Sequence, residues 1–323
     1  MSSAADKGVV IIDGKNFCYR AHYAHAGLSS SDGRATSVLY GGLSMLLNLV
    51  RRLPQNHIVF CWDDRGRTWR HELYSGYKSN RLPSADTKLV AGQIDAFREI
   101  LSQLGIQQFE VPAVECDDVI GVLVYRLFEL GICNPIIISS TDRDFYQLVN
   151  RVVRIAREGK DNKIRLIDTK AVFEEFEVYP REWLDYRSLC GDKTDCIPAA
   201  IQRLGPKTAA KFIRLGFSSA YERWEDMPYE YQQRFAQFKP IWQRITLTRR
   251  LSSIIMQPLA CSFASEQARS GLQLLREQIA ADTIRRDPSG FSKAAYSALI
   301  DFLAEYEMAE LIGRRQELMT IGR

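Results

Sequence analysis

The stretch Val9-Val-Ile-Ile-Asp13-Gly14-Lys-Asn16 runs from an apolar segment directly into an acid and a glycine. Most of the other acidic clusters in the chain also follow short apolar runs that read as buried strands. The carboxyl ends of parallel strands in an α/β sheet face one crevice, so these acids are expected to converge there. Like charges in one crevice need a positive partner, which predicts divalent metal ions. The clustered acids are Asp13, Asp63, Glu115, Asp117, Asp118, Asp142, Asp144, Asp192 and Asp195.

The first half of the chain alternates short β-branched runs with longer amphipathic patterns, which predicts an α/β fold with a mostly parallel sheet. After about residue 169 one helical pattern follows another. We therefore predict two domains, an α/β domain over residues 1–168 and an α-helical domain over residues 169–323. The predicted strands are residues 9–12, 58–62, 107–111 and 136–139, with a terminal hairpin over 152–156 and 163–167. The predicted helices are residues 37–53, 91–104 and 119–130.

Composition excludes several classes of protein. The 323 residues carry a net charge of only +4, but the remainder is strongly basic once the clustered acids are set aside, which suits a phosphate polyanion. The seven cysteines are scattered singly and the four histidines lack metal-ligand spacing, so neither a zinc site nor a disulfide framework is predicted. No apolar run is long enough for a bilayer span or a signal peptide, and we expect a cytoplasmic protein.

Basic residues follow the second acid. Five cations and two tyrosines lie within twenty residues of Asp63, in a stretch that includes Gly76-Tyr77-Lys78-Ser-Asn-Arg81. Arginine and lysine would grip a scissile phosphodiester while a tyrosine stacks on an unpaired base, and the alternative is a solvated basic face. The polar stretch 79–87 is either a mobile crossing or an ordinary surface loop.

A turn near residue 205 has a different chemistry. In Leu204-Gly205-Pro206-Lys207-Thr208, a glycine precedes a proline at the first helical position. Backbone N–H groups exposed at such a helix start can hold a phosphate together with Lys207 and Thr208. The alternative is an ordinary helix start.

In this order and spacing, the motifs closely resemble the 5′ nuclease family, which includes the 5′-3′ exonuclease domain of bacterial DNA polymerase I and phage flap endonucleases. We number the acidic motifs in chain order: the first contains Asp13-Gly14, the second Asp63, the third Glu115-x-Asp-Asp118, the fourth Thr141-Asp-x-Asp144 and the fifth Gly191-Asp-x-x-Asp195. The resemblance rests on the first, third, fourth and fifth of these and on Gly205-x-Lys-Thr-Ala209. It also includes Trp69-Arg-His-Glu72 and Gly76-Tyr-Lys-x-x-Arg81. It implies a PIN-like α/β sheet flanked by helices, followed by an α-helical DNA-binding domain with a helix-turn-helix-type duplex-binding element.

The resemblance also implies roles for individual residues. Two metal sites would share the acidic cleft, with Asp118 able to serve either. At the base of a helical arch near residues 79–95, Lys78 and Arg81 would contact the scissile phosphate, with Tyr77 stacking and Arg70 supporting phosphate contacts. The first metal would be held by Asp13, Asp63, Glu115 and Asp117, and the second by Asp142, Asp144, Asp192 and Asp195. The duplex would be held by Gly205, Lys207, Thr208 and Lys211.

The chain departs from the family where the turn grips the duplex, because Cys196, Ala199 and Gln202-Arg203 replace an asparagine and two glycines, with one residue inserted. This departure puts in question the K⁺ site that the turn often forms in the family.

The predicted function is a structure-specific 5′ nuclease that cuts DNA at 5′ flaps or 5′ ends and also RNA primers in RNA/DNA hybrids. We expect it to depend on Mg²⁺ or Mn²⁺, because the ligands are hard oxygens. A monomer beside a replicative polymerase is expected. The alternatives are a catalytically weak duplex-end DNA-binding protein and a PIN-type ribonuclease.

Overall fold

The computed structural model describes residues 8–53, 57–82, 84–132, 135–159, 163–200, 204–222, 224–226, 228–279, 293–314 and 317. Pro83, most of the turn of the terminal hairpin, and Gln202-Arg203 lie outside these residues. None of the described helices is both long enough and apolar enough to cross a membrane.

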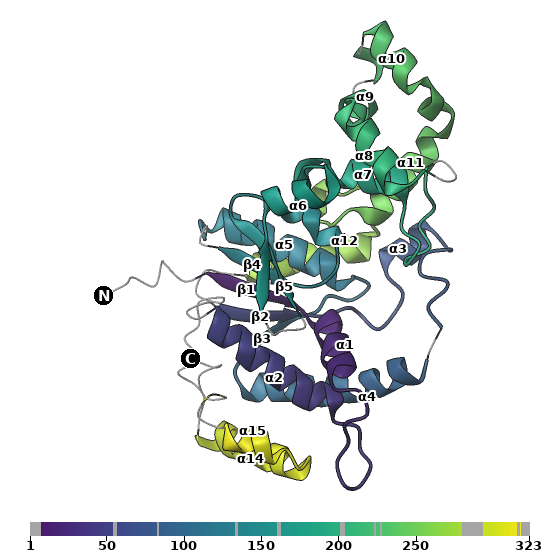
Figure 1. Cartoon of the computed structure of the whole chain (residues 1–323). Coiled ribbons are helices and arrows are strands. Elements are labelled where there is room, and N and C mark those ends of the chain that lie inside the picture. The colour runs from purple at the N-terminus through teal and green to yellow at the C-terminus, as the bar shows by residue number, and fades with distance from the viewer. Residues whose placement is uncertain are drawn as a thin grey trace.

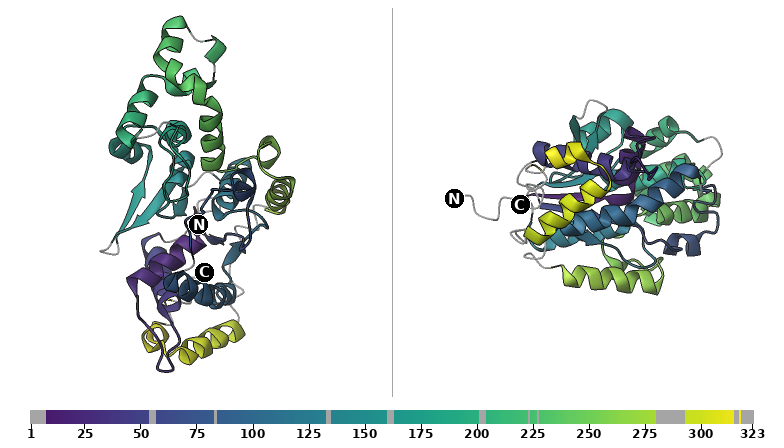
Figure 2. Two further views of the ribbon diagram at one scale, coloured as in Figure 1. Left: turned by 90° about the vertical axis from the view of Figure 1, so that its right-hand side faces the viewer. Right: turned by 90° about the horizontal axis from the view of Figure 1, so that it is seen from below.

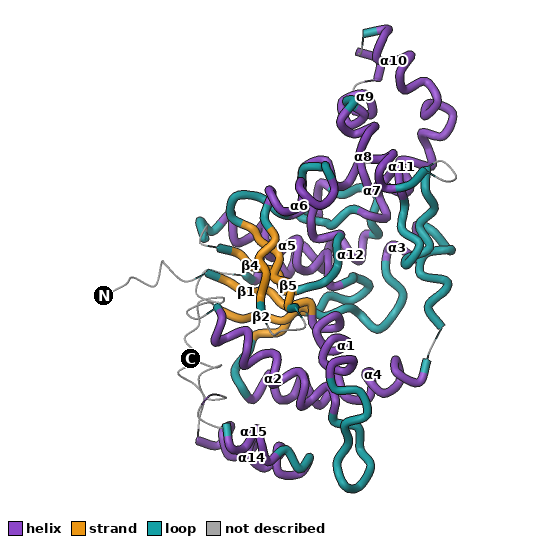
Figure 3. Tube along the Cα trace, in the orientation of Figure 1, coloured by secondary structure: helices purple, strands orange, loops and turns teal. Residues whose placement is uncertain are grey.

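A six-stranded sheet forms the centre of the molecule (Figure 3). Its order is β3-β2-β1-β4-β5-β6, and every pairing is parallel except that of β5 with β6. The α/β prediction is confirmed, although β3 ends two residues earlier than expected. The strands are β1 Val9–Asp13, β2 His57–Cys61, β3 Gln107–Phe109, β4 Ile136–Ser139, β5 Val153–Glu158 and β6 Ile164–Ile167.

Helices cover both faces of the sheet (Figure 1). Alternate side chains of a strand point to opposite faces, so Val9 and Ile11 join one buried cluster while Val10 and Ile12 join the other. One face is covered by α1 Gly14–Ala24, α2 Ser37–Arg52 and α4 Ala85–Gln103, and the other by α5 Cys116–Glu129 with α12 Glu266–Gln278 packed on it. Both faces of the central strands are therefore buried.

The described helices after residue 169 do not gather in one group (Figures 1 and 2). One group extends above the sheet, α12 returns to α5, and the pair α14 Lys293–Glu305 and α15 Ala309–Gly313 lies below the sheet, with α14 against α4. The helical part is thus interleaved with the α/β part. The upper group comprises α6 Thr169–Phe176, α7 Trp183–Cys190, α8 Pro206–Arg214, α9 Phe217–Glu222, α10 Tyr229–Phe235 and α11 Trp242–Ser252.

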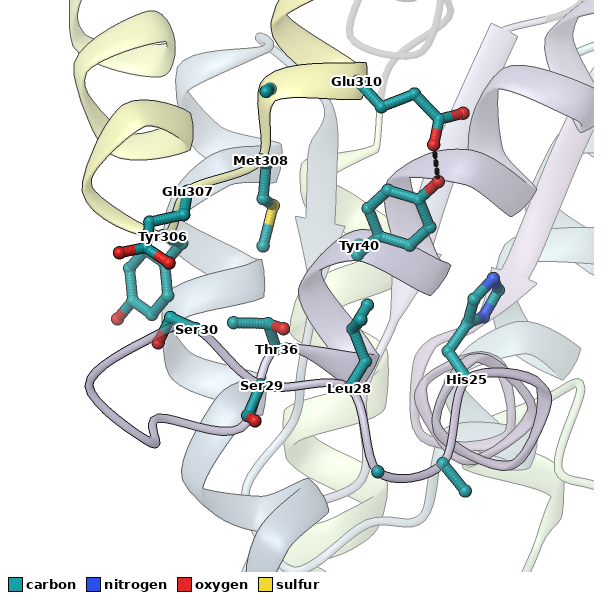
Figure 4. A pocket seen from close by; sticks show the side chains of 13 residues that line it. His25, Leu28, Ser29, Ser30, Thr36, Tyr40, Tyr306, Glu307, Met308 and Glu310 are labelled. Atoms are coloured by element: carbon teal, nitrogen blue, oxygen red, sulfur yellow. Dashed lines mark hydrogen bonds between the residues drawn. The ribbon is translucent and has the colours of Figure 1, made fainter.

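The turn between α14 and α15 is tied to the loop that joins α1 to α2. The backbone N–H of Ser31 donates to Glu307 over 2.8 Å, and the hydroxyl of Tyr40 donates to Glu310 (Figure 4). The two segments enclose a cavity of about 610 Å³ whose walls include Leu28 and Met308. The carboxylates of Glu307 and Glu310 are already bound to Ser31 and Tyr40, so we assign the cavity no ligand.

The described residues of the arch expected near 79–95 are helical only from Ala85 onward. Among the described residues between α3, Trp69–Leu73, and α4, residues 75–80 form turns. The helix expected near residue 91 begins already at Ala85, because Ser84 caps it by accepting the N–H of Thr87 over 3.1 Å. The helical part of the implied arch thus belongs to α4, whose Phe97 is buried against Phe17, and the arch itself stays a prediction.

Candidate active site

A cleft of about 260 Å³ lies at the carboxyl ends of the parallel strands. It brings together acids that are far apart in the sequence, as expected from the parallel sheet. Lys15, Asn16, Tyr19, Lys78 and Arg81 line it as well. The acids that line it are Asp13, Asp63, Glu115, Asp117, Asp142, Asp144 and Asp195.

The first two acids are fixed by backbone groups at the strand ends. Asp13 ends β1 and caps α1 by accepting the N–H of Asn16 over 3.1 Å. Asp63 follows β2 and accepts the N–H of Cys116, over 2.8 Å, at the start of α5. The residue after Asp13 must be glycine, because a Cβ at Gly14 would lie 2.5 Å from the ring of Trp62.

A pair of amide and hydroxyl contacts joins the first motif to the fourth. Asn16 donates its side-chain amide to Thr141 Oγ1 over 2.8 Å, and the backbone N–H of Thr141 donates back to Asn16 Oδ1 over 3.2 Å. The hydroxyl of Ser140 donates to Asp13 over 3.0 Å and accepts the N–H of Asp142, also over 3.0 Å. The ends of β1 and β4 are therefore held in register at the cleft.

Arg70 neutralises the carboxylates of the third motif. Its guanidinium donates to Glu115 at 3.3 Å, Asp117 at 3.0 Å and Asp118 at 2.8 Å, and we call these four residues the Arg70 cluster. It also donates to the carbonyl oxygen of Leu251, in the last turn of α11, at 2.9 Å. A further bond of 2.7 Å reaches the carbonyl oxygen of Ser253, directly after this helix. Only 1% of Arg70 is exposed, so the expected phosphate contact is corrected: burial keeps this side chain away from any DNA.

Asp118 does not line the cleft. The residue is fully buried, and its carboxylate accepts the indole N–H of Trp69 over 2.7 Å and the backbone N–H of Ile255 over 2.9 Å, in addition to Arg70. These donors occupy both of its oxygens. We therefore correct its assignment as a metal ligand and regard it as a structural carboxylate.

Tyr77 is also buried, with 4% exposed, and does not offer a free ring to a base. Its hydroxyl donates to Glu115 over 2.8 Å, and Lys78 Nζ donates to the other oxygen of Glu115 over 2.8 Å. Burial would raise the pKa of Glu115, but the charges of Arg70 and Lys78 outweigh it and lower this pKa to about 2. The expected stacking role of Tyr77 is thus corrected to one of orienting a carboxylate.

A second guanidinium serves the fourth and fifth motifs. Arg187 Nε lies 2.8 Å from Asp144, its terminal nitrogens bind Asp192 and donate to the carbonyl of Gly191 over 3.2 Å, and we call Arg187, Asp144 and Asp192 the Arg187 cluster. Asp192 itself does not line the cleft. Asp195 does, and it binds Arg81.

Several carboxyls in the cleft have a raised pKa, among them Asp13, Asp117, Asp142 and Asp144. Burial, with the nearby charge of Asp63 and then Asp142, raises the pKa of Asp13 to about 7. Burial also raises the pKa of Asp144 to about 7, and Asp142 and Asp192 add to the effect while Arg187 opposes it. Within the described part of the chain, neither Asp13 nor Asp142 has a cationic side chain as a partner. The cleft therefore holds more negative charge than its own cations neutralise.

The donor atoms fit a hard divalent cation, since every acid offers oxygen and the thiol of Cys116 is taken up in a contact of 3.1 Å with the carbonyl of Cys61. Among the described residues, however, no three acids, histidines or cysteines lie close enough together to enclose a metal ion as they stand. Cationic side chains hold many of these acids instead, as Lys15 holds Asp63 at 3.1 Å. Metal binding therefore requires these ion pairs to open.

Two residues beside this site have a strained backbone. Lys78 has φ 53° and Cys196 has φ 57°, in the left-handed region that residues with a Cβ rarely adopt. The two strained segments are joined, because the N–H of Lys78 donates to the carbonyl of Asp195 over 2.9 Å. Cys196 thus occupies a position that favours asparagine or glycine, which gives a physical reason for the asparagine that the family has there.

The expected duplex-binding residues lie apart from the cleft. Gly205 is the N-cap of α8, and Lys207, Thr208 and Lys211 are exposed on that helix. A Cβ at Gly205 would meet no atom within 4 Å, and φ is −86°, so neither packing nor backbone conformation requires glycine there. Their contact with DNA stays a prediction.

Sequence reasoning missed several residues of the cleft. Lys15 and Asn16 lie two and three residues after Asp13, and Tyr19 lies one turn further along α1, so helical spacing from Asp13 could have found them. Arg187 lies one turn before the fifth motif on α7. The contacts of Arg70 with residues 251 and 253 had no signal in the sequence.

A family model described as the 5′-3′ exonuclease N-terminal resolvase-like domain matches residues 8–177. The 5′-3′ exonuclease of Aquifex aeolicus is 33% identical over 227 residues, which are 70% of this chain and 76% of that protein. The DNA polymerase I of Deinococcus radiodurans is 37% identical over 206 residues, which are 64% of this chain. The aligned part is only 20% of that polymerase.

Among solved structures, the fold is similar to that of the T5 5′-exonuclease with bound divalent zinc ions. The TM-score is 0.64 at 17% identity, and the match covers 84% of this chain and 97% of the other. At this identity the likeness concerns the fold.

Proposed function

Because this chain belongs to the 5′-3′ exonuclease family, we propose that it is a structure-specific 5′ nuclease that hydrolyses DNA phosphodiesters where single strands meet duplex. The observation that carries the proposal is one cleft in which acids from five separate stretches of sequence face Lys78 and Arg81. Such a cleft combines a site for divalent cations with side chains that bind phosphate.

The metal ligands follow from the position of each carboxylate. We propose Asp13, Asp63, Glu115 and Asp117 for one ion and Asp142, Asp144 and Asp195, supported by Asp192, for the other. Bound there, Mg²⁺ or Mn²⁺ would supply a water of lowered pKa and would neutralise charge on the leaving oxygen.

The chain's own cations would act on the substrate. Lys78 and Arg81 bind Glu115 and Asp195 in this structure, and a scissile phosphate would compete for them once those carboxylates are neutralised. The hydrogen bond from Tyr77 would keep Glu115 oriented meanwhile. Lys78 lies in a turn, and its strained backbone would help to aim its side chain into the cleft.

The substrate class follows from charge and family. Exposed Lys207 and Lys211 on α8 would hold a duplex through its phosphates, which favours junctions of single strand and duplex over a free single strand. We propose DNA with a 5′ flap or 5′ end as substrate, and RNA annealed to DNA as a second one.

A labelled 5′-flap DNA tests the proposal, incubated with Mg²⁺ or Mn²⁺. The substitution Asp142→Ala is expected to remove cleavage, because it removes a proposed metal ligand. Flap binding is expected to stay within about threefold, because Asp142 has no cationic partner in the described part of the chain that the change would leave unpaired. Glu174→Ala is the matched control, since Glu174 pairs with Lys170 on the surface of α6, outside the cleft. The proposal is rejected if the unmodified chain binds the flap and releases no product with either ion.

A further inference from the structure

A second hollow, of about 510 Å³, lies on the part of the fold away from the acid cleft. Its walls are apolar and aromatic, and two exposed arginines line it as well. We call it the basic hollow, and the residues used below are Phe128, Val149, Val152, Tyr179, Arg151 and Arg181.

Its position separates it from the nuclease cleft. Val152 directly precedes β5, at the amino ends of the parallel strands, whereas the acids follow the carboxyl ends. Phe128 is in the last turn of α5, and Glu115 caps the other end of that helix. A helix of 14 residues is about 20 Å long, so the hollow does not touch the cleft.

The charge of the hollow is not compensated by the protein. Within the described residues, neither Arg151 nor Arg181 has a hydrogen bond or an ion pair, and the acids nearby are already bound. Glu129 binds Arg126 and Arg276, and Glu182 accepts the backbone N–H of Tyr179 over 3.0 Å. Two guanidinium groups beside an apolar hollow therefore favour a ligand that is both acidic and apolar.

The backbone of both arginine segments is already ordered. Asn150 Oδ1 accepts the N–H of Val152 over 2.8 Å and that of Val153 over 3.1 Å, which fixes the turn that carries Arg151. Arg181 lies in a short 3₁₀ helix, residues 180–182, whose start is capped by Glu182. Little backbone ordering would therefore oppose binding.

The aromatic ring in the hollow argues against a nucleic acid. Phe173 stacks on Tyr179 with ring centroids 4.5 Å apart, and the guanidinium of Arg181 lies over the same ring at 5.3 Å. These groups take up the ring surface that an unpaired base would need for stacking. A hollow with apolar walls fits a side chain inserted as an anchor better than it fits a sugar-phosphate backbone.

We propose that the basic hollow docks a short acidic segment of a partner protein. An aromatic or large aliphatic side chain of that segment enters between Phe128, Val149 and Val152. Its flanking carboxylates bind Arg151 and Arg181.

A random heptapeptide library on phage, panned against the full chain, tests this proposal. The enriched peptides are expected to carry an aromatic or large aliphatic residue beside Asp or Glu. A fluorescein-labelled copy of the strongest one is expected to bind at least tenfold more weakly to the double variant Arg151→Glu/Arg181→Glu, by fluorescence anisotropy. Replacing the apolar anchor of the peptide with Ala is expected to weaken binding to a similar degree.

The control is the double variant Arg52→Glu/Arg165→Glu, which makes the same change of charge at exposed positions outside the hollow and is expected to bind the peptide normally. The proposal is overturned if panning enriches no acidic and apolar sequence, or if both double variants lose the peptide equally. It is also overturned if Arg151→Glu/Arg181→Glu weakens binding of a labelled oligothymidylate or slows flap cleavage, because the hollow would then lie on the path of DNA.

Discussion

The two arginine clusters beside the cleft solve the same electrostatic problem in different ways. Arg70 is buried, binds three carboxylates, and is held by carbonyl oxygens from residues 251 and 253. Arg187 is partly exposed and binds two carboxylates, and among the described residues the carbonyl that it reaches belongs to Gly191, four residues away. The first cation is part of the fold, whereas the second is held mainly by the acids that it neutralises and can give way to an ion.

The largest difference is expected in stability. Arg70→Gln leaves three buried carboxylates without their cation, so the free energy of unfolding should fall by about 3–5 kcal/mol. Arg187→Gln should cost about 1 kcal/mol, because Asp144 and Asp192 are partly exposed, unlike Asp118. Urea unfolding of both variants measures this, and equal losses would end the distinction between the clusters.

The pH dependence tests the crowding of the cleft. The pKa of Asp13 is raised to about 7 in the folded chain, so its protonated form stabilises the fold. This contribution is fully present below the pKa of the unfolded chain and is lost as the pH rises through about 7. Without added metal, the free energy of unfolding should therefore fall by about 2 kcal/mol between pH 5 and pH 8.

The variant Asp13→Asn should flatten this slope, and Arg52→Glu should leave it unchanged. Added Mn²⁺ should restore stability at pH 8 more than at pH 5, because the ion binds the deprotonated carboxyls. A slope that survives in Asp13→Asn would assign the titration to other groups, Asp144 first among them.

Metal affinity should separate the clusters further. Removing the competing cation by Arg187→Gln should tighten binding of one Mn²⁺ by about tenfold, or about 1.4 kcal/mol, as measured by calorimetry without DNA. Arg143→Gln is the control, since Arg143 pairs with Glu175 on the surface instead of with the cleft. Unchanged affinity would mean that Arg187 remains in place beside the bound ion.

The smallest effect is expected from backbone strain on the Asp195 side. Cys196→Asn places a residue that tolerates positive φ in a left-handed position, and should raise the free energy of unfolding by about 0.5–1 kcal/mol. Cys196→Ala, which also lacks the thiol, should give no gain. If both variants stabilise the chain equally, the thiol rather than the backbone is responsible.

The sheet and the convergence of acids could be predicted because both depend on local patterns. An apolar run such as Val9–Ile12 marks a buried strand, and an acid at its carboxyl end marks the crevice of a parallel sheet. Contacts between distant segments could not be predicted in this way. Arg70 reads as an exposed cation in a basic stretch, and only the return of residues 251–255 to the third motif buries it.

The misplaced roles share that cause. Tyr77 and Asp118 look like a stacking ring and a metal ligand when only their neighbours in the sequence are considered. Each is buried by partners many residues away in the sequence, and Ile255, whose N–H donates to Asp118, is one of them. The start of α4 was misjudged for a local reason, since Ser84 and Thr87 form a cap that the polar composition of the segment concealed.

The bonds from Arg70 to Leu251 and Ser253 set a limit on how this protein can be shortened. Every acid of the cleft precedes residue 196, so a fragment that stops near residue 200 carries the complete set of candidate ligands. It would nevertheless expose a guanidinium whose two carbonyl acceptors had been deleted, together with the face of α5 on which α12 rests. A minimal catalytic fragment must therefore extend through α12, and a chain truncated near residue 200 should lose activity although it keeps every candidate ligand.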